Sequence, residues 1–326
     1  MTMRAVVLTA PGPVDHLHLR DLPIPAAAAG QVRIRVKAFG LNRSELHLRL
    51  GYAENARFPI VPGIEAVGVV DAAPDSDLLP GQQVATMMGG MGRAFDGGYA
   101  EYTVVPRTQV IPFRSELPWA TLGAVPETLQ TAHGSLTVGL DLRPGQTLLI
   151  RGGTSALGYA TATLARDRGA TVLSTTRRPE RLADLAHHGV HHPLLDDGAV
   201  AARVREIVPE GVDAALELVG APTLPDTLAA TRVHGTVCFA GMLSNEWIVK
   251  DFYPIGYLPA GVRLTGYGGE AANLPAEILQ RTLDRLAAGE TTLGPLTVYP
   301  MSEIRAAHQA IESNTVSGKV VVTTDA

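Results

Sequence analysis

The residues whose types and spacing best suit the binding of a reactive cofactor are three glycines in the middle of the sequence. Gly152, Gly153 and Gly158 follow the apolar run Thr147–Ile150, with only Ser, Thr, Ala and Leu between them. Such a turn lets the backbone approach a pyrophosphate, whose charge is met by unpaired N–H groups and by the dipole of the next helix. The spacing, G-G-x-x-x-x-G, departs from the usual G-x-G-x-x-G. The turn alone is therefore compatible with a structural role as well as with dinucleotide binding.

The end of the next expected strand bears on the choice of cofactor. An NAD site usually has Asp or Glu about 20 residues after the glycines, to bind the ribose 2′-hydroxyl. Here Thr175 or Thr176 holds that place, and Arg177 and Arg178 follow. Because Pro179 suits the first position of a helix, we expect the arginines at a helix N-terminus, where cations are disfavoured unless a phosphate is bound. A solvated arginine pair is the alternative, but the pattern favours NADPH.

Composition and charge exclude several classes of protein. The 326 residues allow about two domains, and a chain that is 46% hydrophobic and 18% charged is globular. The net charge of −5, without a basic stripe, argues against nucleic acid and anionic membranes as partners. The early apolar run Ala5–Leu8 is too short for a signal peptide, and no stretch approaches a membrane span. One cysteine, Cys238 in an expected buried strand, allows no disulfide within the chain and suits the cytoplasm.

Turn residues and hydrophobic periodicity predict an all-β domain at the start of the chain. Up to about Leu122, short apolar runs are broken by Gly and Pro, as in a sandwich or barrel. Its strands are expected at Arg4–Leu8, Gln31–Ala38, Ala66–Ala72, Gln83–Met87 and Tyr99–Val105.

From about Gly123 to Thr265, strands and helices alternate, which predicts a doubly wound parallel sheet. Its strands are expected at Thr147–Ile150, Thr171–Thr176, His192–Leu195, Ala214–Leu218, Thr236–Ala240 and Arg263–Thr265, with helices at Pro179–His188 and Pro222–Thr231. The tail, a helix at Leu274–Ala288 and a strand at Gly318–Thr323, is expected to pack back on the first domain.

Eight short motifs follow one another along nearly the whole chain. They are GLNRSE (Gly40–Glu45), PGIEAVGVV (Pro62–Val70), LLPGQQV (Leu78–Val84), GGYAEYTVVP (Gly97–Pro106), TLQTAHGSL (Thr128–Leu136), the glycine turn, ELVG (Glu217–Gly220) and SGKVVV (Ser317–Val322). In this order they resemble the medium-chain dehydrogenase/reductase superfamily, and within it the zinc-free quinone oxidoreductase branch, the zeta-crystallin-like enzymes. The resemblance implies an α/β fold: a Rossmann doubly wound parallel sheet over 123–265, which binds NADPH, and a GroES-like mostly-β catalytic domain formed by 1–122 and 266–326.

The resemblance also assigns residues to the cofactor. It implies contacts with the pyrophosphate, the 2′-phosphate, the ribose and the nicotinamide ring. The implied cofactor-binding residues are Thr131, Gly153, Ala156, Leu157, Gly158, Thr176, Arg177, Arg178, Val219, Gly220, Ala240, Gly241 and Met242.

Metal ligands separate this branch from the zinc alcohol dehydrogenases. Catalytic zinc needs Cys, His or carboxylate ligands. Where those enzymes have their first cysteine this chain has Asn42, and where they have a His before a glutamate it has Ile64 before Glu65. The place of their structural-zinc lobe, residues 85–98, contains no cysteine. We therefore expect neither zinc site.

Two other groups of residues resemble metal ligands. Met87, Met88 and Met91 are expected to be mobile loop residues rather than soft ligands. The four histidines within His187–His192 are expected on the outer rim of the Rossmann domain, where they would bind metal only adventitiously. His187 and His188 would end a helix capped by Gly189, and the other two would begin the next strand.

By the same resemblance, the substrate faces Asn42 and Tyr52. Both side chains donate hydrogen bonds to a carbonyl or quinone oxygen, and Tyr52 also has the chemistry of a weak acid. The alternative role of Tyr52 is an aromatic anchor for the loop Gly51–Pro59. Arg43 would contact either a phosphate or Glu65.

Residues 243–269 depart from the common family pattern and hold five aromatics: Trp247, Phe252, Tyr253, Tyr257 and Tyr267. Apolar walls suit a flat hydrophobic acceptor. The segment is equally compatible with a subunit interface, since the last Rossmann strand in this family meets its mate across a two-fold axis.

Together, these observations indicate a cytoplasmic, zinc-independent, homodimeric oxidoreductase. It is expected to transfer hydride from NADPH to a small hydrophobic quinone or α,β-unsaturated carbonyl. The alternatives are a zinc-independent alcohol or carbonyl dehydrogenase of the same superfamily and a non-catalytic NADPH-binding protein. The absent ligands argue against a metal-dependent alcohol dehydrogenase.

Overall fold

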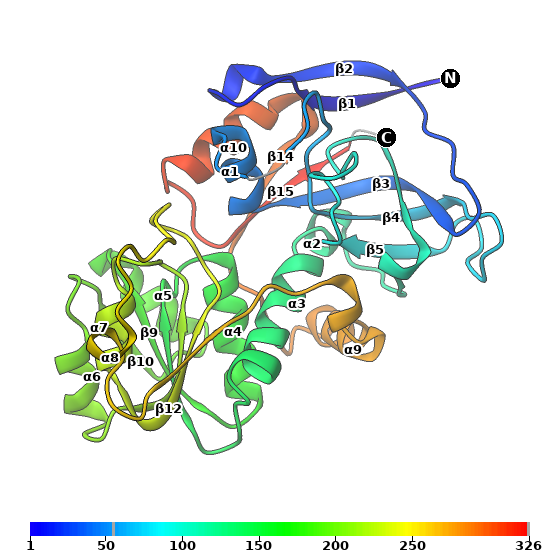
Figure 1. Ribbon diagram of the computed structural model, residues 1–326. Helices are drawn as coiled ribbons and strands as arrows, with labels where there is room; N and C mark the ends of the chain where they lie inside the picture. Colours follow the sequence, from blue (N-terminus) through cyan, green and yellow to red (C-terminus); the bar gives the residue numbers. More distant parts are fainter. Residues whose placement is uncertain (54–55, 325–326) are drawn as a thin grey trace. The chain divides into compact units, whose positions relative to one another are not determined.

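A computed structural model describes residues 1–53 and 56–324, which form two compact units (Figure 1). The first, the β unit, comprises Met1–Gln130, Gly269–Thr291 and Pro295–Ala326. The second, the Rossmann unit, comprises Thr131–Gly268 and Thr292–Gly294. The domain limits taken from the sequence stay a prediction.

The β unit is built on a seven-stranded sheet. Its strand order is β14-β15-β3-β4-β5-β7, and β6 also pairs with β3. The strands are β3 (Gln31–Leu41), β4 (Glu65–Ala72), β5 (Gln83–Met87), β6 (Tyr102–Pro106), β7 (Val110–Pro112), β14 (Leu296–Pro300) and β15 (Lys319–Thr323). A separate two-stranded antiparallel sheet contains β1 (Thr2–Leu8) and β2 (Leu17–Pro23).

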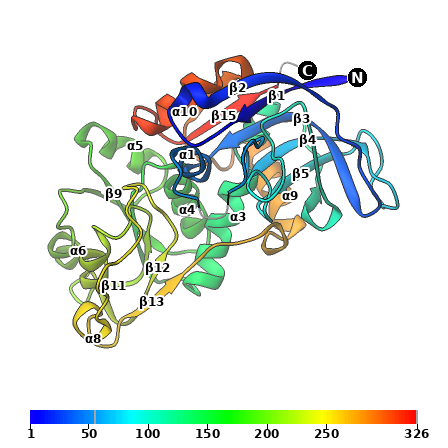
Figure 2. The ribbon, with the colours of Figure 1, turned by 45° about the horizontal axis from the view of Figure 1, so that its top comes forward.

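Helices and short 3₁₀ turns complete the β unit. The helices are α1 (Arg43–Leu50), α2 (Trp119–Leu122), α9 (Ala276–Ala287) and α10 (Ile304–Glu312), and the turns are η1 (Val14–His16), η2 (Arg107–Gln109), η5 (Ala271–Asn273) and η6 (Met301–Glu303). Helices α1 and α10 lie side by side (Figure 2) although they are far apart in the sequence. The tail thus returns to the first part of the chain, as predicted, because β15 pairs antiparallel with β3.

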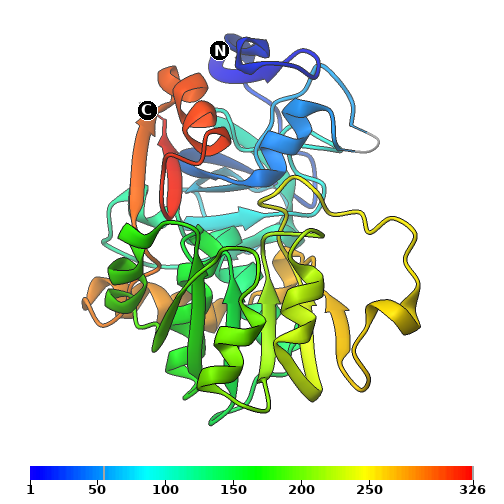
Figure 3. The same cartoon turned by 90° about the vertical axis from the view of Figure 1, so that its left-hand side faces the viewer.

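The Rossmann unit contains a six-stranded parallel sheet of order β10-β9-β8-β11-β12-β13 (Figure 3). The strands are β8 (Thr147–Arg151), β9 (Thr171–Thr176), β10 (His192–Leu195), β11 (Val212–Glu217), β12 (Thr231–Phe239) and β13 (Arg263–Gly266). The helical segments are α4 (Ala156–Asp167), η4 (Pro179–Arg181), α5 (Leu182–His187), α6 (Ala201–Ile207), α7 (Leu224–Ala229) and α8 (Pro254–Tyr257). Helix α3 (Pro126–Gly134) crosses from one unit to the other and continues as a π-helical turn, η3 (Ser135–Gly139).

The order of strands in this sheet confirms the predicted doubly wound fold. Each strand pairs in parallel with its neighbours, and the order reverses between β8 and β11. In open parallel sheets, ligands bind beyond the carboxyl ends of the strands at this switch point. The glycine turn follows β8 at that point.

Most predicted elements are present, and two differences have clear causes. The strand expected at Tyr99–Val105 begins only at Tyr102, because Tyr99 and Ala100 pair with β1 instead. The helix expected to end at Thr231 ends at Ala229. Thr231 is already the first residue of β12, where it pairs with Val212 of β11.

The prediction of mobile loop methionines was wrong for Met87 and Met91. Met87 belongs to β5, and Met87 and Met91 are fully buried, with Met91 packed in the core of the β unit. A short bridge between Met91 and Phe95 closes the turn and holds this segment against the sheet. Within residues 1–53 and 56–324, no helix is long and apolar enough to cross a bilayer.

Candidate functional site

The glycine turn forms a tightly hydrogen-bonded link between β8 and α4. Gly152 has a φ of +88°, which favours glycine, and its N–H donates to Thr175 Oγ1. The N–H of Gly153 donates to the carbonyl oxygen of Thr175 at 2.8 Å. Ser155 caps α4, since its Oγ accepts the N–H of Gly158 at 3.1 Å.

Steric limits explain the other two glycines. A Cβ on Gly153 would lie 1.8 Å from Ser174 Oγ, and a Cβ on Gly158 would lie 2.5 Å from the carbonyl oxygen of Gly153. The Ser174 side chain would have to move to admit a Cβ at residue 153, whereas the start of α4 approaches the backbone of the turn this closely only with glycine at residue 158.

The arrangement also fits a bound pyrophosphate. Among the described residues, the first two N–H groups of α4, those of Ala156 and Leu157, have no hydrogen-bond acceptor. Unpaired N–H groups at the positive end of a helix dipole are the usual phosphate ligands of this fold.

The end of β9 has the character expected of the cofactor-selecting position. Thr176 is buried and its Oγ1 accepts the N–H of Arg178. Arg177 is exposed and Arg178 partly so, and Pro179 follows as the first residue of η4. No carboxylate stands among these residues, so this edge of the site presents cations and a hydroxyl.

One residue at the end of β11 that the sequence analysis did not single out, Glu217, binds the loops after β11 and β12, the first through its carboxylate and the second through its backbone carbonyl oxygen. Glu217, fully buried at the end of β11, accepts N–H groups from Val219 at 2.7 Å and Gly220 at 3.0 Å, and the hydroxyls of Thr223 and Thr227. Burial raises the pKa of Glu217 even though these bonds oppose the shift. The carbonyl oxygen of Glu217 accepts the N–H groups of the predicted residues Ala240 and Gly241.

A second group that the sequence analysis missed lies beneath the same strand ends. Arg151, the last residue of β8, is fully buried and binds Asp196 and Asp226 at 2.5 and 2.6 Å. Asp196 also accepts a hydrogen bond from Thr175 Oγ1, and Asp226 accepts the N–H of Val200 ahead of α6. The sequence signal was an arginine that closes an apolar strand, since such a charge needs buried partners.

The predicted cofactor residues of the Rossmann unit therefore gather at the carboxyl ends of β8, β9, β11 and β12. Met242 follows Gly241 in the loop after β12, and Thr131, which is buried, is the first residue of this unit and lies in α3. Their contacts with a cofactor stay a prediction.

The two predicted substrate residues lie at opposite ends of α1 in the β unit. Asn42 precedes the helix, and its N–H donates to Glu45 Oε2 at 2.9 Å. Gly51 ends the helix in a left-handed conformation with a φ of 81°, and Tyr52 follows with 48% of its surface exposed. Residues 54 and 55 of the adjoining loop lie outside the described residues. Both roles proposed for Tyr52 stay open.

Around Asn42 the structure adds a buried network. Asn42 Nδ2 donates to Glu65 Oε1 at 3.0 Å, and Lys319 Nζ donates to Asn42 Oδ1 at 2.6 Å. Lys319 also binds Glu65 Oε1 at 2.7 Å, and Glu65 Oε2 accepts the N–H of Glu127 in the first turn of α3. Arg43 donates to Asn314 Oδ1. The sequence signal for Lys319 was a lysine opening the apolar run of β15.

Residues 1–53 and 56–324 contain no group of three His, Cys, Asp or Glu side chains arranged to hold a metal ion. In the histidine cluster, the imidazole of His188 contacts the carbonyl oxygen of Asp184, and His191 Nδ1 accepts the N–H of Val172.

The aromatic segment between β12 and β13 is largely exposed, and Figure 3 shows it leaving the sheet as a long connection. Tyr253 is 65% and Ile255 84% exposed, whereas Tyr257 packs on Phe252, with ring centroids 5.1 Å apart. This exposure is compatible with either predicted role, a substrate wall or a subunit interface.

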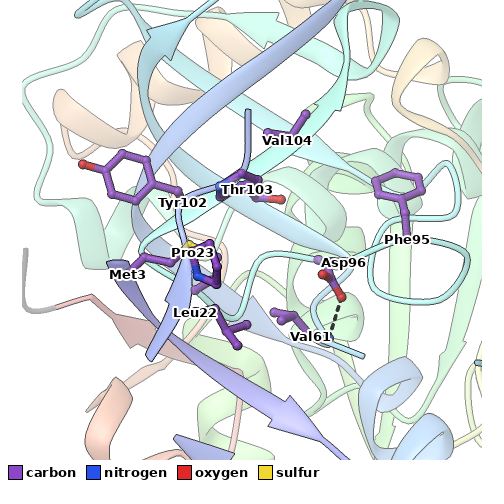
Figure 4. Close-up of a pocket in the computed structure, with 12 residues that line it drawn as sticks. Met3, Leu22, Pro23, Val61, Phe95, Asp96, Tyr102, Thr103 and Val104 are labelled. Carbon is purple, nitrogen blue, oxygen red and sulfur yellow. Dashed lines mark hydrogen bonds between the residues drawn. The ribbon is translucent and has the colours of Figure 1, made fainter. Parts of the chain in front are cut away.

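A cavity of about 340 Å³ in the β unit lies apart from these residues (Figure 4). Met3, Val61, Phe95 and Tyr102 give it an apolar lining. Its carboxylate, Asp96, accepts the N–H of Val61 at 2.9 Å. None of the predicted site residues lines this cavity.

Two family models match the chain. The alcohol dehydrogenase GroES-like domain matches residues 28–115, and the family described as zinc-binding dehydrogenase matches residues 188–322.

Individual relatives agree with these matches. A probable quinone oxidoreductase of Schizosaccharomyces pombe is 27% identical over 99% of this chain and 97% of its own length. Prostaglandin reductase-3 of Bos taurus is 29% identical over 74% of this chain and 63% of its own length. Among solved structures, AibC is 26% identical with a TM-score of 0.87, covering 100% of this chain and 96% of that chain.

Proposed function

The chain belongs to the medium-chain dehydrogenase/reductase superfamily of oxidoreductases, and from this premise we propose that it reduces a quinone or an α,β-unsaturated carbonyl with NADPH and without zinc. The observation that carries the proposal is the network at Asn42. At the positions where the zinc enzymes of the superfamily have ligands, this chain has an amide and an isoleucine. The amide is held by a lysine ammonium at 2.6 Å.

The Rossmann unit supports the cofactor part of the proposal. The amides at the start of α4 suit the pyrophosphate, and Arg177 and Arg178, which directly follow β9, suit a 2′-phosphate. Bound NADPH would supply a hydride, and the acceptor would take the accompanying proton from water.

The β unit supports the acceptor part. Negative charge builds on the acceptor oxygen as carbon receives hydride, so a fixed hydrogen-bond donor lowers the barrier. Asn42 is a partly exposed donor on a rigid helix end, and Tyr52 is a half-exposed phenol at the other end of α1. The names of the relatives, quinone oxidoreductase and prostaglandin reductase, agree with a conjugated carbonyl or quinone acceptor.

A panel of quinones and enals tests this proposal. Tag-free protein should oxidise NADPH faster than NADH with at least one acceptor, and prolonged treatment with a chelator should leave the rate unchanged. Zinc bound stoichiometrically near Asn42 or Glu65 would refute the zinc-free assignment. Tight NADPH binding with no turnover of any acceptor would favour a non-catalytic NADPH-binding protein.

A further inference from the structure

Lys319 brings a positive charge into the interior of the β unit. Only 4% of its side chain is exposed, and Nζ lies 2.7 Å from Glu65 Oε1, 2.6 Å from Asn42 Oδ1 and 3.6 Å from Glu127 Oε2. Burial lowers the pKa of Lys319, but the charges of Glu65 and Glu127 raise it by more. The pKa of Lys319 therefore lies above its ordinary value. The side chain is therefore an ammonium at neutral pH.

The surrounding backbone makes room for this ion pair. A Cβ on Gly40 would lie 2.2 Å from Glu65 Oε1 and 2.4 Å from Lys319 Cε. Gly40 lies in β3, directly across from Val321 of β15. Glycine at this position of β3 is thus what allows Lys319 and Glu65 to meet.

The network permits only one orientation of the Asn42 amide. An ammonium only donates hydrogen bonds and a carboxylate only accepts them. The oxygen of Asn42 must therefore face Lys319, and its nitrogen must face Glu65. Nδ2 has a second hydrogen, which none of the described residues accepts, and the side chain is partly exposed. One N–H of Asn42 thus remains for a ligand.

Glu45 holds the backbone of the same residue. It is fully buried, and its oxygens accept the N–H groups of Asn42 at 2.9 Å and Ile64 at 2.8 Å. Asn42 is consequently held at its backbone by Glu45 and at both ends of its amide by Lys319 and Glu65.

We propose that Lys319 is a positioning residue for the reduction: its ammonium orients and polarises the Asn42 amide so that the remaining N–H is presented to the acceptor oxygen. The inference rests on the proposed function. A chain of hydrogen bonds from a cation through an amide strengthens the last donor, because each bond polarises the next. In this way the ammonium acts on the acceptor through Asn42, without contacting the acceptor itself.

The test needs variants that lose the fixed orientation of the Asn42 amide but still fold. Lys319→Met alone leaves Glu65 as a buried, unbalanced charge and is expected to destabilise the fold. The double variant Glu65→Gln with Lys319→Met removes both charges, and the introduced amide, which can donate or accept, no longer dictates the orientation of Asn42. Each variant is also made in the Asn42→Ala background. The matched control is Lys37→Met, which removes a lysine of the neighbouring strand β3.

Turnover and NADPH affinity are then compared among variants whose Tm is close to that of the wild type. With a native-like Tm and unchanged NADPH affinity, the double variant should lose kcat on the order of tenfold for the best acceptor. This loss is smaller than the about 10²–10³-fold of a deleted donor, because the N–H of Asn42 is no longer oriented but is still present. In the Asn42→Ala background the same pair of changes should alter kcat by no more than about twofold, because both act through one amide. Lys37→Met should keep the wild-type kcat.

An NMR experiment examines the ammonium without relying on turnover. The chain has three lysines, Lys37, Lys250 and Lys319, so the ¹⁵N-lysine spectrum is easily assigned. A slowly exchanging ammonium signal should vanish in the Lys319→Met variant and shift in Asn42→Ala.

The outcomes distinguish the two proposals. Full kcat in the folded double variant, or no protected ammonium signal, would overturn the positioning role while leaving the proposed function standing. Failure of the wild-type chain to reduce any acceptor would overturn the proposed function and the inference with it.

Discussion

At the scale of single residues, the cofactor preference depends on two arginine side chains. Replacing Arg177 and Arg178 by Ala should abolish a preference for NADPH over NADH of about tenfold or more, because charge-assisted hydrogen bonds contribute about 1.5–3 kcal/mol each. Dissociation constants from nicotinamide fluorescence measure this. Arg143→Ala, an exposed arginine ahead of β8, should change neither affinity. Equal affinities in the wild-type chain would rule out the assignment.

Tyr52 is the second residue-scale prediction. If its exposed hydroxyl donates to the acceptor oxygen, Tyr52→Phe should lower kcat by up to about 10²-fold while leaving NADPH affinity unchanged. Tyr102→Phe, in the same unit but beside the separate cavity, is the control and should keep full activity. Wild-type kcat in Tyr52→Phe would leave Tyr52 as an aromatic anchor of its loop.

At the scale of elements, the Arg151 network holds the strand ends of the Rossmann unit together. It joins β8 to Asp196 after β10 and to Asp226 in α7. Burial raises the pKa of Asp196, but Arg151 lowers it more, so the pKa lies below its ordinary value and the carboxylate stays ionised. The loops that the cofactor is proposed to contact therefore depend on a buried ionic cluster.

Removing the arginine should destabilise the fold strongly. Arg151→Met leaves two carboxylates without their cation, and the free energy of unfolding in urea should fall by about 3–5 kcal/mol. Arg143→Met breaks a highly exposed pair with Asp141 and should leave the unfolding midpoint unchanged. Equal midpoints for Arg151→Met and the wild type would contradict the role given to this cluster.

At the scale of the whole molecule, two buried groups set opposite pH dependences of stability. Burial, with the charge of Arg49, lowers the pKa of His308 from 6.5 to about 3. Unfolding then takes up a proton, so His308 makes stability fall as pH drops from 6.5 toward 3, at roughly 1.4 kcal/mol per pH unit. Burial raises the pKa of Glu45 from 4.5 to about 7, so Glu45 makes stability fall as pH rises from 4.5 toward 7.

Between pH 4.5 and 6.5 the two slopes oppose each other, and the contribution of the pair to the Tm should be nearly flat. Thermal unfolding across pH tests each group. The difference in Tm between the wild type and His308→Gln should shrink toward pH 3, and that between the wild type and Glu45→Gln should shrink toward pH 7. Curves that stay parallel to the wild type would contradict the assignment.

The sequence by itself determined the fold class and the positions of most strands along the chain. Parallel strands buried on both faces are short apolar runs, and the glycine turn is local, so β8, β9 and β10 were predicted almost to the residue. Elements with weaker patterns were missed. Strand β2 is mostly exposed, and no residue of β14 is fully buried, so neither has the run of buried apolar residues that marks a core strand.

Only the tertiary structure decided the partners of the buried charges. Lys319 meets Asn42 across 277 residues of sequence, and Arg151 reaches Asp196 and Asp226 across 45 and 75. Periodicity describes which face of an element is buried, but not which distant side chain completes an ion pair there. The sequence therefore identified Asn42 as a residue in place of a zinc ligand, whereas the fold alone supplied the ammonium beside it.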